Sequence, residues 1–301
     1  MLAAIAGGAD AQVEAALDII ARADPDVLLL TDLDWDYRAE ALLALCARLR
    51  AKGLDYSHFF AAQPNTGIDS GLDLDGNGRV GEARDAQGYG RFTGQHGMAL
   101  VSKLPIGATQ DFSGFLWGDL PESRIASADL PEGAETALRL SSTAHWDVTV
   151  KTAAGQLHLW AFAATPPVFD GPEDRNGRRN ADEIGFWRHY LDGALAERPA
   201  AAPFVLIGKA NLDPDRGAGR RTAMRDLLED PRFQDAAPTG PGAPEAAPLA
   251  TADFGGSVGP LRLDYILPAA GIKVTGAGVI WSETAARASD HRLVFLDLAL
   301  P

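Results

Sequence analysis

The sequence predicts a mixed α/β domain, and three observations lead to that prediction. Apolar side chains recur at helical spacing over residues 11–24, and the short apolar run of residues 26–32 (DVLLLTD) that follows is typical of a buried strand ending in acidic residues. A second helix is expected from about residue 37 to 52, closed by Gly53. The remainder of the chain is richer in strand-like runs. Helix and strand therefore alternate early, and strands dominate later.

The later elements follow one another without an interdomain linker. Residues 153–155 (AAG) form a turn between two strand-like runs, which predicts a hairpin. Polar stretches at 63–96 and 164–180 interrupt the pattern, and 236–252, rich in proline and alanine, is expected to be a mobile surface loop. One domain covering residues 1–301 is therefore expected. Strands are predicted at 97–103, 146–151, 156–163, 204–208, 261–267, 272–280 and 292–298, and helices near 181–195 and 220–228.

Composition limits the classes of partner. Hydrophobic residues make up 46% of the chain, enough for a substantial core. The net charge of −14 makes the average surface repel polyanions, so nucleic acid is not a favoured partner. No apolar run reaches the length of a membrane span, and the opening residues lack the basic and apolar segments of a signal peptide. Cys46 is the single cysteine, so no intrachain disulfide forms. Localisation and oligomeric state stay open.

Acidic and amide residues gather at the ends of several predicted strands. Oxygen ligands that converge from such ends are the donors that magnesium prefers, and an Asp/His pair can form a general base. The alternative is that each cluster is an ordinary cap or turn. The clusters are residues 31–34 (TDLD), 208–211 (GKAN), 262–265 (RLDY), 289–291 (SDH) and the loop 170–180.

The order of these motifs resembles the endonuclease/exonuclease/phosphatase family. Residues 142–150 (STAHWDVTV) and 165–180 (TPPVFDGPEDRNGRRN) are similar to a bacterial, often exported branch of it, and the resemblance extends over roughly residues 12 to 299. It implies a four-layer α/β/β/α sandwich with two mainly antiparallel or mixed sheets. It also implies magnesium-dependent hydrolysis of a phosphoester, without naming the substrate.

The resemblance assigns a role to each matching residue. Asp290 and His291 correspond to the C-terminal pair, in which the aspartate helps to hold the metal and the histidine acts on the attacking water or the phosphate. Asp264 corresponds to the carboxylate that orients this histidine, and Asn211 to the amide that contacts the scissile phosphate. Asp32 stands where the family usually has a glutamate that ligates magnesium.

Three departures from the family pattern concern the same site. Lys209 stands where the family has an aspartate, and Ala163 where it has a histidine before Thr-Pro-Pro. The family's first strand, which carries an asparagine, has no counterpart here, and a mis-set start site or a deletion could each explain this. In the case of a deletion, the bare sheet edge would invite pairing with another chain. We expect the ammonium of Lys209 to replace the metal among Asp32, Asp290 and Asn211; the alternative is that it points to solvent.

Three functions remain open at this stage. The first is a degenerate phosphohydrolase, with catalysis weak or lost, that acts as a binding or structural protein. The second is an active phosphodiesterase or phosphatase with an altered mechanism that uses Asp264 and His291. The third is a calcium-ordered interaction module.

The third function rests on residues 73–85 (DLDGNGRVGEARD), which begin like an EF-hand calcium loop. The twelfth position is Arg84 rather than glutamate, so another acidic side chain must close the site. A plain turn is the alternative. The candidate calcium ligands are Asp73, Asp75, Asn77, the carbonyl of Arg79, and Asp85.

The loop after Ala163 offers a candidate anion site. Arg175 and Asn176 are expected to face a phosphate, with a self-paired salt-bridge loop as the alternative. His145 is expected to be a core histidine rather than half of a rim pair with Asp147. The tryptophans at 146, 160 and 187 are expected to be core residues rather than stacking platforms.

Overall fold

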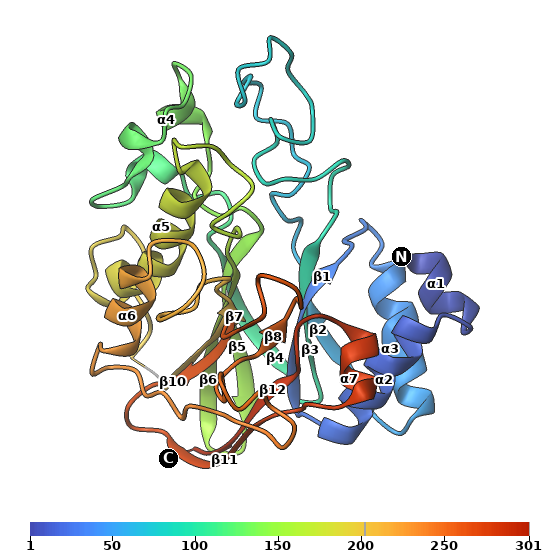
Figure 1. Ribbon diagram of the computed structural model, residues 1–301. Coiled ribbons are helices and arrows are strands. Elements are labelled where there is room, and N and C mark those ends of the chain that lie inside the picture. The colour runs from blue at the N-terminus through green and yellow to red at the C-terminus, as the bar shows by residue number, and fades with distance from the viewer. Residues whose placement is uncertain (202, 301) are drawn as a thin grey trace.

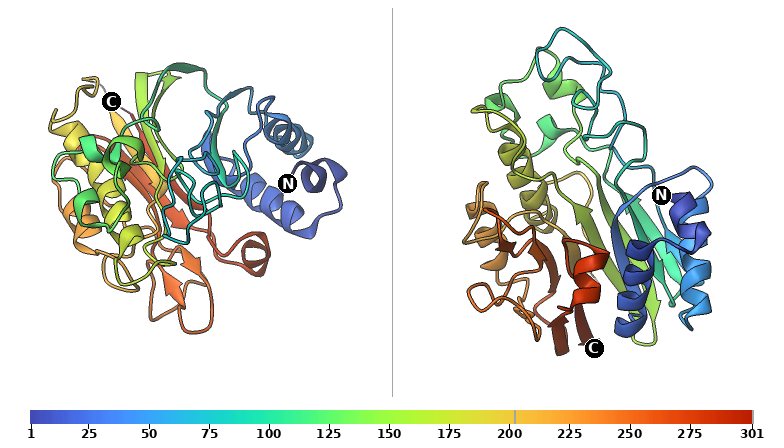
Figure 2. Two further views of the ribbon diagram at one scale, coloured as in Figure 1. Left: turned by 90° about the horizontal axis from the view of Figure 1, so that it is seen from above. Right: turned by 45° about the vertical axis from the view of Figure 1, so that its right-hand side comes forward.

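Two layers of β-sheet pack face to face between two groups of helices in the computed structural model, which describes residues 1–201 and 203–300 (Figure 1). Seen from above, the two helical groups lie on opposite sides of the sheets (Figure 2). This is the four-layer α/β/β/α arrangement that the resemblance implied. One helical layer holds α1 (Leu2–Gly7), α2 (Ala11–Ala23), α3 (Glu40–Ala51) and α7 (Glu283–Ala288); the other holds α5 (Arg175–Leu191) and α6 (Thr222–Leu228).

The larger sheet has five strands in the order β10-β7-β6-β5-β4. Only β6 and β7 run parallel, and α5 makes the crossover between them. Strands β5 and β6 form the predicted hairpin, in which Thr152 pairs with Gly155. The strands are β4 (Ile106–Asp111), β5 (Ala144–Thr152), β6 (Gly155–Ala163), β7 (Phe204–Lys209) and β10 (Asp264–Pro268).

The opposite layer contains two separate antiparallel sheets. One has the order β1-β3-β2, with β1 (Val27–Leu33), β3 (Gly97–Ser102) and β2 (His58–Phe60). The other pairs β11 (Lys273–Val279) with β12 (Val294–Ala299). A short ribbon of β8 (Ala252–Asp253) and β9 (Pro260–Leu261), the small helix α4 (Ala134–Ala137) and the 3₁₀ turns η1 (Trp117–Asp119) and η2 (Ile125–Ser127) complete the elements.

Local sequence explains how the first strand is placed. The Asp10 carboxylate caps α2 by accepting hydrogen bonds from the amides of Gln12 and Val13 at 2.9 and 3.0 Å. The helix ends at Asp24, which adopts a left-handed conformation, and Pro25 follows. The chain then turns directly into β1, whose carboxyl end carries Asp32.

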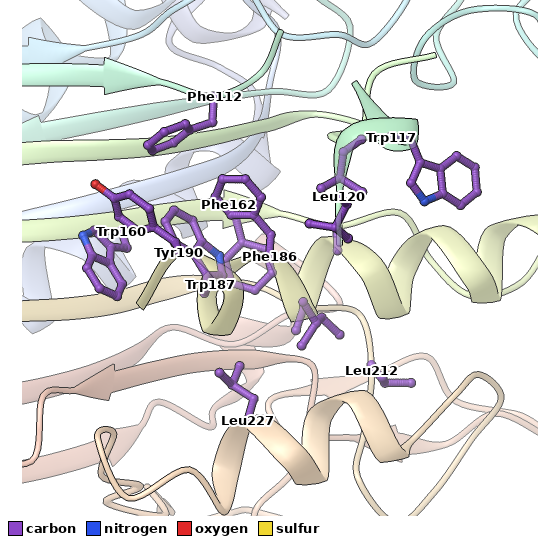
Figure 3. Close-up of a cluster of buried hydrophobic side chains, with 14 of the residues drawn as sticks. Phe112, Trp117, Leu120, Trp160, Phe162, Phe186, Trp187, Tyr190, Leu212 and Leu227 are labelled. Carbon is purple, nitrogen blue, oxygen red and sulfur yellow. The ribbon is translucent and has the colours of Figure 1, made fainter. Parts of the chain in front are cut away.

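Aromatic side chains fill the space between the five-stranded sheet and α5 (Figure 3). Trp160 and Trp187 stack with their rings 5.6 Å apart, and His145 stacks on Trp187 at 5.4 Å. Trp146 is fully buried between the two sheets. The prediction that these tryptophans and His145 belong to the core is confirmed.

Three sequence-based expectations were wrong. Helix α5 begins at Arg175 rather than near residue 181, because its first turns bury polar side chains that form hydrogen bonds and therefore show no apolar periodicity. The stretch 236–252 ends in buried residues, including Ala250 and Thr251, and is not wholly a surface loop. The run 261–267 is divided into β9 and β10 because the amide of Leu263 bonds the Thr251 hydroxyl instead of a strand.

No helix among the described residues combines the length and the apolar character needed to cross a membrane.

Candidate active site

A single row of paired residues crosses the five-stranded sheet at one end. Ala163 on β6 lies opposite Lys209 on β7, and Lys209 lies opposite Asp264 on β10. Because directly paired residues point to the same face of a sheet, the three side chains project together. Ala163 is part of the core between the two sheets, so the row faces the opposite sheet.

Asp264 holds His291 in a defined orientation. The Nδ1–H of His291 donates to Asp264 Oδ2 at 2.8 Å, and the Thr251 hydroxyl donates to the same oxygen at 2.8 Å. The Thr251 oxygen in turn accepts hydrogen bonds from the amides of Leu263 and Asp264. The pair predicted from the RLDY and SDH motifs is thus assembled, and Thr251 braces it.

The same contact sets the charge of the histidine. Burial disfavours the imidazolium, but the negative charge of Asp264 and its hydrogen bond outweigh burial, so the pKa of His291 is raised above its ordinary value. The edge of Phe254 lies against the imidazole, with the ring centres 5.7 Å apart. His291 is therefore an oriented imidazole whose protonated form is stabilised by Asp264.

Lys209 spans the gap between the sheets. Its ammonium forms an ion pair and hydrogen bond with Oδ2 of Asp32 at the end of β1. The Lys209 side chain is only 12% exposed, whereas that of Asp32 is 50% exposed. His96 Nδ1 lies 3.5 Å from the other Asp32 oxygen. The alternative expectation, that the Lys209 side chain points to solvent, was therefore wrong.

Three residues around this pair have a left-handed backbone. The φ angles of Asp32, His96 and Asn211 are 59°, 55° and 54°. Such conformations are uncommon for residues other than glycine and gather at functional sites. The side-chain amide of Asn211 donates to the carbonyl of Ala164 at 2.8 Å, so it holds the segment after β6 in place.

Asp290 does not join this group in the described residues. Its side chain is exposed and forms no ion pair there, while its carbonyl accepts a hydrogen bond from the amide of Asp253 at 2.9 Å. Asp32, Asp290 and His291 do not form a set of three ligand atoms close enough for one ion. With the Asp32 carboxylate paired to an ammonium, the donors present do not fit the magnesium ion that the resemblance implies.

A different acidic cluster has the spacing of a cation site. Carboxylate oxygens of Asp73, Asp75 and Asp85 all lie within 4.8 Å of one another. Asp85 is buried and accepts hydrogen bonds from the amides of Leu74 and Glu82 at 2.9 and 3.0 Å. These three residues could hold a metal ion. The long loop that carries them projects from one end of the molecule (Figure 1).

Two other candidate calcium ligands are placed differently. The Oδ1 atom of Asn77 accepts the amide of Arg79 at 2.9 Å, and its side-chain nitrogen donates to Glu82 at 2.7 Å. Among the described residues, no hydrogen bond links the carbonyl of Arg79 to the three clustered aspartates. Asp85 is thus the residue that closes the group in place of the missing glutamate.

Arg175 and Asn176 brace loops in the structure. Arg175 Nη1 donates to the carbonyl of Leu74 at 2.7 Å, which fastens the acidic loop to the start of α5. The side chain of Asn176 donates to the carbonyl of Val168 at 2.7 Å, and its backbone amide donates to the Asp170 carboxylate. The contacts of Asn176 stay within the loop, whereas that of Arg175 reaches another loop and is no salt bridge, so they do not form the self-paired salt-bridge loop of the alternative. A phosphate contact of the two residues stays a prediction.

Glu183 is a supporting residue that the sequence did not suggest. Its Oε1 atom accepts from the amide and hydroxyl of Ser142 at 2.5 and 2.7 Å, and Oε2 accepts from the amide of Thr165 at 2.7 Å. Burial raises the pKa of Glu183, although the charge of nearby Arg179 opposes the shift. The residue joins the segment just before β5 to the segment that follows Ala163. A lone glutamate in a polar stretch gives no sequence signal for such a role.

Comparison with known proteins identifies the class of this sandwich. Residues 5–291 match the Endonuclease/Exonuclease/phosphatase family, and the chain belongs to it. No curated protein sequence matches the chain.

Solved structures with the same fold support this assignment. A family protein from Beutenbergia cavernae has a TM-score of 0.61 at 19% identity over 98% of this chain and 67% of that one. A family protein from Leptotrichia buccalis has a TM-score of 0.57 at 14% identity, covering 96% and 93%. The human nocturnin catalytic domain with bound sulfate has a TM-score of 0.55 at 14% identity, covering 97% and 87%. At these identities the likeness concerns the fold.

Proposed function

We propose that this protein is a degenerate member of its family that binds a phosphoester ligand and whose metal-dependent hydrolysis is lost or strongly weakened. The observation that carries the proposal is the ion pair between Lys209 and Asp32. At an effective dielectric near 20, a lysine ammonium and a divalent ion about 4 Å apart repel each other by about 8 kcal/mol. A metal that approached Asp32 would have to displace the ammonium first.

The change at residue 163 acts in the same direction. The buried methyl group of Ala163 can neither donate a hydrogen bond nor transfer a proton, whereas the family has a histidine there. Removing one acid/base group typically costs about 100- to 10,000-fold in rate. Rate losses of this kind are not additive, so the effects of Lys209 and Ala163 on the rate cannot simply be multiplied.

The oriented Asp264–His291 pair favours a second candidate. It could activate a water molecule without a metal, with Asp264 fixing the imidazole so that Nε2 accepts the proton. Lys209 would then be the cation that faces the phosphoester. This candidate predicts weak hydrolysis that does not depend on added metal.

One assay separates the two candidates. The protein is incubated with bis-(4-nitrophenyl) phosphate in magnesium, in manganese and in EDTA. The degenerate-site proposal predicts no turnover above the blank in any of them. Turnover that survives EDTA and is lost in His291→Ala would establish the second candidate. Turnover that requires metal and is lost in His291→Ala would overturn both.

Magnesium titration tests the electrostatic step by itself. Isothermal titration of the parent is expected to show no binding that depends on Asp32. Millimolar or tighter binding that vanishes in Asp32→Ala would refute the replacement of the metal by Lys209. The double variant Lys209→Asp with Ala163→His restores the family pattern, and its comparison with Lys209→Asp alone measures what the histidine adds.

We also propose that Asp73, Asp75 and Asp85 hold calcium and that the ion orders the loop. Three carboxylates within 4.8 Å repel one another unless a cation is shared between them. Leu74, inside this loop, is buried in the core next to α5 and accepts a hydrogen bond from Arg175. An ion bound here would thus also steady the loop at the start of that helix.

A further inference from the structure

Thr251 is a fully buried residue whose hydroxyl group uses all of its hydrogen-bonding capacity. The oxygen accepts from the amides of Leu263 and Asp264 at 2.9 and 3.0 Å, and the hydroxyl donates to Asp264 Oδ2 at 2.8 Å. A hydroxyl group has one proton and two lone pairs. Because both lone pairs face amides, the proton has one direction left, and the Asp264 carboxylate is its acceptor.

The same carboxylate oxygen is the partner of the histidine. His291 Nδ1 lies 2.8 Å from Asp264 Oδ2, the atom to which Thr251 also donates. An ionised carboxylate can only accept, so Nδ1 of the neutral imidazole carries the proton and Nε2 is left as an acceptor. An imidazole without such a partner exchanges between its two neutral tautomers. The tautomer of His291 therefore depends on where the Asp264 carboxylate is held.

The strand that carries Thr251 also holds the backbone next to the histidine. The carbonyl of Thr251 accepts from the amide of Arg292 at 2.7 Å. Ala252, the next residue of β8, forms an antiparallel bridge with His291 on one side and pairs with β9 on the other. The segment that carries His291 thus lies against β8 as a strand would.

Asp264 and His291 come from different layers of the sandwich. Asp264 begins β10 in the five-stranded sheet, whereas His291 precedes β12 in the opposite layer. Thr251 contacts both parts, Asp264 through its hydroxyl and the histidine segment through its carbonyl. One buried residue therefore fixes the carboxylate relative to the imidazole.

We propose that Thr251 is a positioning residue of the Asp264–His291 pair, whose hydroxyl proton holds the carboxylate where it keeps the histidine proton on Nδ1 and leaves Nε2 free to accept. The proposal rests on the second candidate of the proposed function, in which this pair activates water. The tautomer itself can be measured whether or not the protein hydrolyses a phosphoester.

Removal of the hydroxyl should release the carboxylate. Thr251→Val keeps the shape of the side chain but leaves the amides of Leu263 and Asp264 without an acceptor. Buried amides without a partner are costly, and the Asp264 carboxylate is an alternative acceptor beside them. We expect the carboxylate to turn toward these amides and away from His291, so that the imidazole populates both neutral tautomers.

Nuclear magnetic resonance of the protein with ¹⁵N-labelled histidine reads the tautomer directly. Spectra are recorded on the alkaline side of the titration, where His291 is neutral, and His291→Gln identifies its signals. The parent is expected to show the Nδ1–H form and Thr251→Val a mixture of both forms. Thr251→Ser keeps a hydroxyl with the same donor and acceptors, so it should restore the parent's form.

Thr149 provides the matched control. It is also buried, and it lies on β5 beyond Ala144, whose partner Ala163 belongs to the row of residues at the active-site end. Thr149→Val removes a threonine hydroxyl from a buried sheet position away from the Asp264–His291 pair. The tautomer of His291 in this variant should equal that of the parent.

Kinetics add a second measurement if the parent turns over bis-(4-nitrophenyl) phosphate in EDTA. Thr251→Val is then expected to lower kcat by about tenfold or more with little change in KM, because a misplaced base affects the transition state rather than substrate binding. Thr251→Ser should recover most of the loss. A residue that only stabilised the fold would leave kcat per folded molecule unchanged.

The outcomes distinguish this proposal from the proposed function. An Nδ1–H form that is lost in Thr251→Val and kept in Thr251→Ser supports the positioning role, and if no protein shows turnover, only the proposed hydrolysis fails. An Nε2–H form in the parent would overturn the role, as would an unchanged tautomer in folded Thr251→Val.

The parent protein decides if Thr251→Val does not fold. The Thr251 hydroxyl proton and the Nδ1 proton of His291 point to the same oxygen, so a nuclear Overhauser contact between them is expected. Its presence supports the positioning role, and its absence overturns it.

Discussion

The ammonium of Lys209 on β7 is paired with the carboxylate of Asp32 on β1, and the pair bridges the two sheets of the sandwich at the active-site end. The two partners differ in environment, because Lys209 is largely buried while Asp32 is half exposed. Water therefore screens the carboxylate, and the attraction adds little to stability. The position of the pair points to a role in the site.

A double-mutant cycle measures this directly. Lys209→Met, Asp32→Asn and the double variant are compared by urea unfolding. We expect a coupling energy below about 1 kcal/mol, because one partner is solvated. A coupling of several kcal/mol would contradict the view that the pair stands in place of a metal and would make it a structural clamp between the sheets.

The buried histidine of the core predicts a pH dependence of stability. Burial lowers the pKa of His145 to about 4, from 6.5 in the unfolded chain. The folded state thus binds fewer protons than the unfolded state between these values, and stability falls as pH drops from 6.5 towards 4, by about 3 kcal/mol. In His145→Gln this part of the pH dependence should disappear.

The contacts of His145 define the protonation state concerned. Its Nε2 lies 2.9 Å from the carbonyl of Glu183, which can only accept, so Nε2 carries the proton and Nδ1 accepts from the Ser141 hydroxyl at 2.6 Å. His189→Gln, on a less buried part of α5, serves as the control and should keep the parent's pH profile. An unchanged profile in His145→Gln would show that other groups cause the acid sensitivity.

Calcium is expected to raise the thermal stability of the parent. A ligand present at 100 times its Kd stabilises the folded state by about 2.7 kcal/mol, so calcium added after EDTA treatment should raise Tm by several degrees. In Asp75→Asn the increase should be lost, because one of the three clustered carboxylates is removed.

A second acidic residue of the loop gives the matched control. Asp69 accepts the amide of Gly71 at 2.9 Å and is not part of the cluster, so Asp69→Asn should keep the calcium response. The same shift in all three proteins, or none in the parent, would count against a calcium site. Scanning calorimetry with magnesium in place of calcium tests the choice of ion.

The sequence pointed to the candidate active site through residues that lie near each other because strands end at a common edge. Asp32, Lys209 and Asp264 each lie at or next to the end of a strand, and strand patterns can be recognised from apolar periodicity. Lys209 and Asp264 are moreover direct neighbours in the sheet. The positions of the motifs were therefore predictable from the strand pattern. The contact between Asp264 and His291 was predictable from the family resemblance.

The supporting residues could not be found in this way. Thr251 reaches Asp264 from a stretch rich in proline and alanine, and His96 reaches Asp32 from a long polar loop. Neither has a local pattern, because each acts through contacts with residues distant in sequence. Asp290 shows the reverse case, since its motif was recognised while its side chain lies exposed. Where a loop side chain points depends on packing that periodicity does not encode.

Glu183 should be essential for the stability of the active-site end of the sheet. It is fully buried and accepts three hydrogen bonds, from the amide and hydroxyl of Ser142 and from the amide of Thr165. Glu183→Ala would leave these donors without their acceptor and would remove the negative charge near the buried cation of Arg179, at a cost of about 3–5 kcal/mol. Urea unfolding measures the loss, with His189→Ala on the same helix as the control, expected to stay within about 0.5 kcal/mol of the parent.

The comparison with Glu183→Gln separates charge from shape. Glutamine keeps the volume but places an NH₂ group against one of the donors, so we expect a loss that approaches that of the alanine variant. Because Glu183 fixes Thr165, next to the Ala164 carbonyl that Asn211 contacts, the loss should also speed amide exchange in residues 163–166. A glutamine variant as stable as the parent would mean that the carboxylate is protonated in the fold and that the network is held by one acceptor oxygen.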